Sequence, residues 1–209
     1  MIRLEKVSKQ FGERLLFSDI SIEFKAGKTY ALIGLSGSGK TTLLNMLAKL
    51  ESYEGQIIYR GKNLKQYKTS DFLRKELGYL FQNFGLLENQ TIDENLRLGL
   101  IGQKLKKDER QKRELEALKN VGLDYLDLGK RVFELSGGEA QRVALAKIIL
   151  KNPPLILADE PTAALDPETS KDIMTRLIAL KNDHRVIVIA THNPIIWEMA
   201  DEVISIHDL

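Results

Sequence analysis

The sequence predicts an α/β fold: a mainly parallel sheet with flanking helices, preceded by an antiparallel β portion and interrupted by an α-helical insertion. Short apolar runs, which are typical of buried parallel strands, alternate with helix-like segments at residues 30–50 and 155–206. Residues 2–24 instead alternate apolar and polar side chains, as antiparallel strands with one exposed face do. Residues 83–131 are highly charged and have helical periodicity. We therefore expect one domain with two appended parts.

A glycine-rich segment follows the strand-like run 30–33 and precedes a helix-like run over 42–50. It reads G-x-x-x-x-G-K-[ST], the P-loop pattern, in which backbone N–H groups point at phosphate oxygens. Lys40 would neutralise phosphate charge, and the Thr41 hydroxyl would bind Mg²⁺. The segment comprises Gly34, Leu35, Ser36, Gly37, Ser38, Gly39, Lys40, Thr41 and Thr42. We expect it to bind a nucleotide; Phe11, at the turn before Gly12, would either stack on the base or complete the edge of the core.

The middle of the chain predicts a strand at 56–59, a short helix over 71–77 capped by Ser70, and a buried strand over 78–82 that ends at Gln82. Thr91 and Glu94 match a capping box that opens a helix over residues 92–100. A second helix is expected over 106–120. Its basic side chains either contact lipid headgroups or an acidic partner, or form a solvated face, which the interspersed acids favour. These residues are Lys104, Lys106, Lys107, Arg110, Lys112 and Arg113.

Ser136 and Glu139 form another capping box, before a helix over 140–151. The box does not require Gly137 and Gly138, and two glycines at the start of a helix cost stability. They suit a site where an anion approaches bare backbone at a helix N-terminus. We therefore expect a second phosphate-binding feature here.

Two further apolar strands are expected, and both end in groups that can do chemistry. The run 155–158 leads into Asp159 and Glu160, which fit a Mg²⁺-holding carboxylate and a general base for an attacking water. The run 186–190 leads to His192, for which we expect a sensor or catalytic role. Between them, Asp166 is expected to cap a helix that has Pro167 at its first position.

Composition narrows the possible functions. Among 209 residues there are 31 basic and 29 acidic side chains, so net charge does not indicate a nucleic-acid partner. There is no cysteine, which excludes disulfides and thiolate metal sites, and the three histidines are scattered. No apolar run approaches the roughly 20 residues that a membrane span needs. We expect an intracellular chain that reaches a membrane only through a partner.

In this order along the chain, the motifs resemble those of the ATP-binding subunit of ABC transporters, and the likeness covers the whole chain. The motifs are Gly34–Thr42 (Walker A), Gln82 (Q-loop), Leu135–Glu139 (LSGGE signature), Leu155–Glu160 (Walker B), Ala164–Asp166 (D-loop) and Thr191–His192 (H-loop). The resemblance implies a P-loop NTPase core with a β subdomain at about residues 1–82 and 155–209, and a helical subdomain at about 83–154. It makes Phe11 the aromatic residue that stacks on adenine.

The resemblance also implies a mechanism. Catalysis would fall to Glu160, His192 and Gln82, and Mg²⁺ would be held by Thr41, Gln82 and Asp159. Two chains would form a head-to-tail homodimer around ATP, with Ser136, Gly137, Gly138 and Asp166 contacting the nucleotide of the other subunit. The implied partner is a separate transmembrane permease, which would hold the chain at the cytoplasmic face of the membrane.

Within the family, residues 82–95 and 156–162 are similar to the macrolide-export and lipoprotein-release group, and most similar to bacteriocin exporters of the lactococcin-972 type. Ala163 and Lys147 depart from that group, which commonly has Gly and Arg there. An importer subunit and a non-transporting signalling or cell-division ATPase stay open as alternatives. A cassette protein of translation or DNA repair is disfavoured, because 209 residues hold neither a second cassette nor a long coiled coil.

Overall fold

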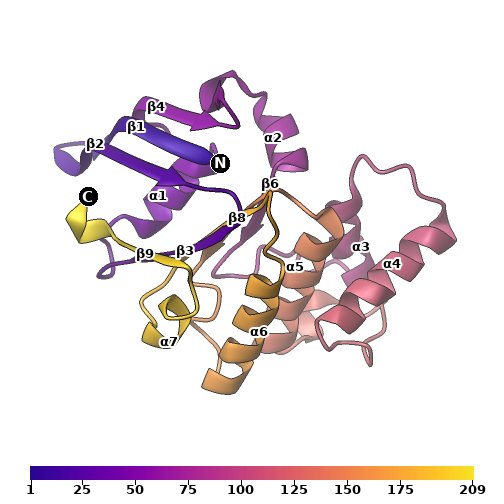
Figure 1. Cartoon of the computed structure of the whole chain (residues 1–209). Coiled ribbons are helices and arrows are strands. Elements are labelled where there is room, and N and C mark those ends of the chain that lie inside the picture. The colour runs from indigo at the N-terminus through magenta and orange to yellow at the C-terminus, as the bar shows by residue number, and fades with distance from the viewer. The chain divides into compact units, whose positions relative to one another are not determined.

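The computed structural model describes residues 1–209 and divides them into two compact units (Figure 1). The first comprises Met1–Tyr79, Pro154–Glu160 and Lys181–Leu209. The second comprises Leu80–Pro153 and Pro161–Leu180. The sequence-based division assigned all of 155–209 to the core, whereas the structure groups residues 161–180 with the helical unit, where their helix packs on a neighbour. None of the helices combines the length and the apolar character needed to cross a lipid bilayer.

An antiparallel sheet opens the first unit, as the alternating pattern predicted. Its strands are β1 (Ile2–Phe11), β2 (Arg14–Phe24), β4 (Glu54–Tyr59) and β5 (Lys62–Asn63), in the order β2-β1-β4-β5. A two-residue turn joins β1 to β2, and Gly12 in this turn has a φ of 55°, which suits glycine. Phe11 and Arg14 pair directly across the turn.

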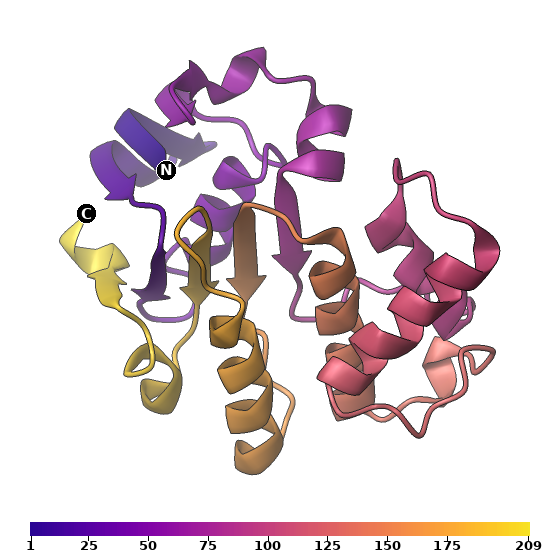
Figure 2. The ribbon, with the colours of Figure 1, turned by 45° about the vertical axis from the view of Figure 1, so that its right-hand side comes forward.

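A parallel sheet forms the other layer of this unit, in the order β6-β7-β8-β3-β9. The strands are β3 (Lys28–Ile33), β6 (Leu77–Leu80), β7 (Leu155–Asp159), β8 (Val186–Ala190) and β9 (Glu202–Ser205). Every residue of β7 and β8 is buried, which explains their uninterrupted apolar runs. Figure 2 shows neighbouring strands of this sheet running in the same direction. The predicted α/β fold class is thus confirmed.

One hydrophobic core joins both sheets of the first unit to α1 (Lys40–Leu47). Short elements complete this unit: α2 (Thr69–Lys75), α7 (Pro194–Trp197) and the 3-10 turns η1 (Leu64–Gln66) and η4 (Ile206–Asp208). The predicted cap of α2 was wrong. Ser70 lies inside the helix, and Lys68 occupies the N-cap position without a side-chain hydrogen bond. The helix starts one residue before Ser70 because the backbone of Lys68 already accepts from Asp71 and Phe72.

The second unit is helical. It contains α3 (Ile92–Arg97), α4 (Lys107–Asn120), α5 (Gly137–Lys151) and α6 (Pro167–Ala179), with 3-10 turns η2 (Leu98–Leu100) and η3 (Val132–Glu134). α3, η2 and α4 pack around α5 (Figure 2). The expected helix over 92–100 ends at Arg97, and the chain continues as a 3-10 turn. A side chain at Gly99 would meet the Lys147 carbonyl at 2.6 Å, so this turn needs a glycine to lie against α5.

α4 largely has the solvated face that the interspersed acids predicted. Arg113 pairs with Glu109 at 2.7 Å, and Arg110 lies 3.8 Å from Asp93. Glu114 is an exception, because its side chain is fully buried. Burial and the nearby Asp93 carboxylate raise the pKa of Glu114 to about 7, against the opposing effect of Arg110. A face that looks solvated in the sequence therefore hides one buried acid.

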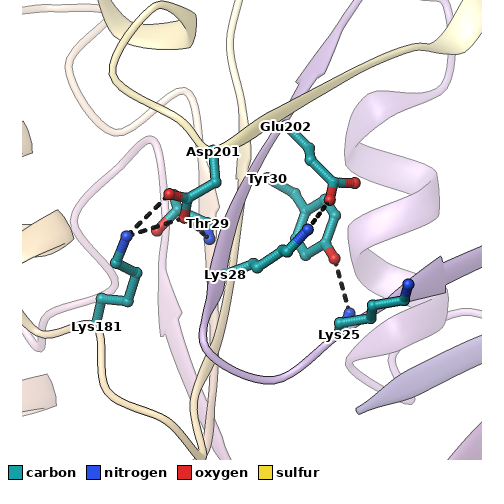
Figure 3. A network of polar contacts seen from close by, with 7 residues as sticks. All are labelled: Lys25, Lys28, Thr29, Tyr30, Lys181, Asp201 and Glu202. Atoms are coloured by element: carbon teal, nitrogen blue, oxygen red, sulfur yellow. Dashed lines mark hydrogen bonds and ion pairs between the residues drawn. The ribbon is translucent and has the colours of Figure 1, made fainter.

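A polar network ties β3 to β9 at the start of both strands (Figure 3). The Asp201 carboxylate accepts from the Thr29 N–H at 2.7 Å and from Lys181 Nζ at 2.9 Å. On the other side of β3, Lys28 pairs with Glu202, and the buried Tyr30 hydroxyl accepts from the Lys25 N–H at 2.8 Å. The Thr29 hydrogen bond, followed by Lys181, lowers the pKa of Asp201.

This network predicts a pH-dependent contribution to stability. A carboxyl group whose pKa is lowered by folding contributes to the free energy of unfolding at pH values above its unfolded-state pKa. This contribution is lost as the pH falls through the folded-state pKa. We expect Asp201→Asn to lower the thermal midpoint at pH 7 by about 3 °C, corresponding to about 1 kcal/mol for a partly exposed carboxylate. The difference from wild type should shrink as the pH approaches 3, and Asp208→Asn, at an exposed carboxylate, should have no effect. A difference that stays constant with pH would contradict this role.

Candidate functional site

The glycine-rich segment forms a loop between β3 and α1, as its pattern predicted. Gly39 has a φ of 106°, and a Cβ there would meet the Phe17 ring at 2.7 Å, so no other residue fits. No side chain caps the N-terminus of α1, so its first N–H groups are directed into the loop without a side-chain acceptor. The Ser38 hydroxyl is buried without a hydrogen-bond partner. These features suit an anionic ligand that accepts several hydrogen bonds.

Lys40 supplies the positive charge of this loop. Its side chain is 8% exposed, and Nζ donates to the carbonyls of Gly34 at 2.9 Å and Leu35 at 3.2 Å. Nζ also lies 3.7 Å from Glu160 Oε1. The Leu35 side chain is 84% exposed, so Leu35 takes part through its backbone. A buried ammonium group held by neutral carbonyls is ready to exchange them for phosphate oxygens.

Two oxygen-bearing side chains meet beside the loop. The Thr41 hydroxyl donates to Asp159 Oδ1 at 3.1 Å. Burial raises the pKa of Asp159, with Thr41 and Lys40 opposing the shift and Glu160 adding to it. Hydroxyl and carboxylate oxygens are the ligands that Mg²⁺ prefers, so this pair fits the ion. The structure has no cluster of three or more His, Asp or Glu side chains that could hold a metal, and Mg²⁺ in such sites is usually completed by substrate phosphates and water.

Glu160 stands directly after β7 in a strained backbone conformation. Its φ is 42°, in the left-handed region that a residue with a side chain seldom adopts. Its N–H donates to the Ala190 carbonyl at 2.9 Å, which ties it to the end of β8. His192 Nδ1 lies 2.9 Å from Oε1, and the His192 N–H donates to Oε2 at 3.4 Å. Strain of this kind persists where the surroundings enforce it, and it is concentrated at functional sites.

Phe11, at the end of β1, is 46% exposed. Lys9 Nζ lies 4.4 Å from the centroid of the Phe11 ring, within cation–π distance. The Lys9 side chain is 8% exposed and is held by Glu51 at 2.8 Å and by Ser52 at 3.2 Å. The ring is therefore backed by a fixed cation and is partly accessible.

The remaining predicted site residues belong to the second unit. Ser136 caps α5 through the predicted capping box, with Gly137 and Gly138 in the first turn, and Asp166 caps α6 by accepting from the Thr169 N–H at 2.9 Å. Both helix starts line one cavity of about 420 Å³. A Cβ on Gly138 would meet Thr169 at 3.1 Å, whereas one on Gly137 would make only ordinary contacts. Within this unit, packing accounts for the glycine at 138 and leaves the glycine at 137 without a steric reason.

Gln82 lies exposed in the turn that follows β6. The next residues of this turn are fixed by Lys147, whose Nζ donates to the Gly85 carbonyl at 2.7 Å. Burial lowers the pKa of Lys147 to about 8. Lys147, which stands where relatives commonly have Arg, thus anchors this turn to α5.

Several residues near these sites were not predicted from the sequence. Arg14 contacts the glycine loop, and Lys9 backs Phe11; the hairpin turn at Gly12 is the signal that could have indicated Arg14. Arg142 lines the cavity and lies four residues after Gly138, on the same helix face. Tyr125, which donates to Glu139 at 2.9 Å, had no sequence signal.

Proteins that present such a loop beside two carboxylates at the end of another strand of the same sheet are of the class that binds and hydrolyses nucleoside triphosphates. The family model described as "ABC transporter" matches residues 17–163, and the chain belongs to this family. It is an ATP-binding, ATP-hydrolysing subunit.

Named relatives and solved structures support the assignment to the ABC transporter family. The chain is 37% identical over 216 residues to the ABC transporter ATP-binding protein YxdL of Bacillus subtilis, covering 100% of this chain and 84% of that protein. It is 40% identical over 196 residues to the methionine import ATP-binding protein MetN of Clostridioides difficile, covering 92% of this chain and 61% of that protein. Among solved structures, the dimeric, ADP- and phosphate-bound cassette MJ0796 superposes with a TM-score of 0.88 at 31% identity, over 98% of this chain and 94% of that one. MJ0796 is from Methanocaldococcus jannaschii.

The position of Lys40 predicts the effect of removing its charge. We expect Lys40→Ala to weaken ATP binding at least about 10-fold, because charge-assisted hydrogen bonds to phosphate are lost. Titration with a fluorescent ATP analogue measures this. Lys28→Ala, at the other end of β3, is the matched control and should bind ATP normally. Unchanged affinity in Lys40→Ala would contradict the assignment of the loop.

Proposed function

We propose that this chain powers a membrane exporter of peptide, antibiotic or lipoprotein-type cargo by closing and opening as an ATP-dependent head-to-tail homodimer. The observation that carries this proposal is the presence of two phosphate-adapted sites on one chain, each on its own unit. One is the loop with Lys40, and the other is the cavity at the starts of α5 and α6. In a head-to-tail pair, the second site of each subunit completes the first site of the other. The dimeric state named for MJ0796 supports this arrangement.

In this dimer the loop residues 34–42 hold the phosphates and Phe11 stacks on adenine. Ser136, Gly137, Gly138 and Asp166 contact the nucleotide of the partner subunit. Thr41 and Asp159, together with Gln82, would hold Mg²⁺, which supplies neutralisation of the phosphate charge when bound. Gly137, in the first turn of α5, has no packing reason to be glycine, and this supports an approach of phosphate to bare backbone at the helix start.

Hydrolysis requires a base that takes a proton from the attacking water. Glu160 is proposed as that base: its carboxylate accepts the proton as the water oxygen bonds to the γ-phosphorus and the bond to the ADP oxygen breaks. His192 lies 2.9 Å from this carboxylate and can orient it, and it is proposed to contact the γ-phosphate as well. Gln82 would contact the water and Mg²⁺ and report occupancy to the helical unit. The products are ADP and phosphate.

Transport direction is the finer part of the proposal. The export assignment rests on the likeness of residues 82–95 and 156–162 to the export group. Import is the second candidate, and the relatives named as methionine importers favour it. A permease that co-purifies with the chain from cell membranes would place it peripherally on the inner face. ATP-driven accumulation of cargo in inverted vesicles would support export, and cargo release from them would support import. A complex that hydrolyses ATP and moves no cargo would favour the signalling alternative.

Replacing the proposed base should separate binding from turnover. We expect Glu160→Gln to bind ATP and form a stable dimer, while turnover falls by about 10³-fold because no group accepts the proton. Phosphate release and size-exclusion chromatography with ATP measure the two effects. Glu198→Gln, at an exposed position, is the control and should match wild type. Normal turnover in Glu160→Gln would sink the base assignment.

Mixing two inactive variants tests whether the sites are shared. Ser136→Asp keeps a good helix cap and places a negative charge where phosphate would approach. Combined with Lys40→Ala subunits, it should form mixed dimers with one competent site each, so ATP hydrolysis returns on mixing. If each chain instead completed its own site, both partners would stay inactive. Hydrolysis that stays absent in proven mixed dimers therefore argues against the head-to-tail arrangement.

A further inference from the structure

The hairpin between β1 and β2 is docked on the glycine loop. Phe17 and Leu16, on β2, lie against Gly39, 2.7 and 3.1 Å from the place a Cβ would take. Arg14, the first residue of β2, donates from Nη2 to the Gly37 carbonyl at 3.0 Å. The loop and the hairpin therefore form one continuous surface.

Arg14 lies on the same face of this surface as Phe11. The two residues are direct cross-strand partners, and such partners project to the same side of a sheet. The turn between them is held by Gln10, whose side chain donates to the Gly12 carbonyl at 2.6 Å. Arg14 is therefore the neighbour of Phe11 across a two-residue turn, and its side chain reaches the loop at Gly37.

The charge of Arg14 is not neutralised. No carboxylate of the chain lies within ion-pair distance, although Glu13 is its neighbour in sequence, and the side chain is exposed. A guanidinium group has five N–H donors, and the carbonyl of Gly37 takes up one of them. Gly37 has open space where a side chain would be, so this side of the loop is accessible.

From this arrangement we propose that Arg14 is a nucleotide-binding residue that contacts the polyphosphate of a bound nucleoside triphosphate or diphosphate. The guanidinium turns from the neutral Gly37 carbonyl to phosphate oxygens, which form stronger, charge-assisted hydrogen bonds with it. The inference rests on the proposed function, because it requires the loop around Lys40 to hold the phosphates.

The test compares ligands that contain the phosphates, the nucleoside or both. Displacement of a fluorescent trinitrophenyl analogue of ADP from the full chain measures affinities for ADP, tripolyphosphate and adenosine at several salt concentrations. We expect Arg14→Gln to weaken ADP and tripolyphosphate by about 5-fold, to flatten their salt dependence and to leave adenosine unchanged. Arg14→Lys should retain part of the affinity and the salt dependence. Arg74→Gln, at an exposed ion pair on α2, should match wild type.

If Arg14 only braces the hairpin, its loss should act on adenosine and tripolyphosphate alike and leave the salt dependence as in wild type. That result, or unchanged affinity for all three ligands, would overturn the inference. Lys40→Ala separates the two hypotheses. If Lys40→Ala binds tripolyphosphate normally, the proposed nucleotide site fails; if it binds poorly while Arg14→Gln is normal, only the role of Arg14 fails.

Discussion

Parallel pairing of β8 with both β3 and β7 determines where three distant chain segments end. Leu32, Asp159 and Ala190 lie in register, so the glycine loop, Glu160 and His192 all emerge at the same edge of the sheet. β7 and β8 are fully buried on both faces, and packing on both sides holds the chemistry-bearing groups at their ends in fixed relation. The 2.9 Å contact of His192 with Glu160 and the 3.7 Å approach of Lys40 follow from this register.

Glycine residues shape both of the proposed phosphate sites. In the loop, Gly39 has no side chain, so Phe17 can pack directly against the backbone of the turn. Gly138 likewise has no side chain, which lets α6 approach α5. The two glycines of the signature therefore have different roles. Gly138 allows α5 and α6 to pack closely, whereas Gly137 leaves backbone accessible. A substitution at Gly138 would combine a packing defect with any effect on ligand binding, whereas Gly137 separates them.

Patterns that depend on neighbours in sequence were predicted well. The buried strands, the capping boxes at Thr91 and Ser136 and the cap at Asp166 all follow from local rules, and the structure confirms them. The prediction failed where a local signal had a competitor, as when the backbone of Lys68 started α2 ahead of Ser70. The sequence made no prediction for contacts that depend on strand register or on helix packing. The contact of Arg14 with Gly37 and the burial of Glu114 are of this kind.

The position of β3 between β8 and β9 also has a consequence for synthesis of the chain. The glycine loop ends at residue 42, yet both strands that pair with β3 come after residue 185. At 5–20 residues per second, roughly 7 to 30 s separate synthesis of the loop from synthesis of β8. During this interval β3 has two unpaired edges and an apolar sequence, which is the state in which nascent chains associate wrongly. The parallel sheet around β3 can therefore be completed only after β9 has been made.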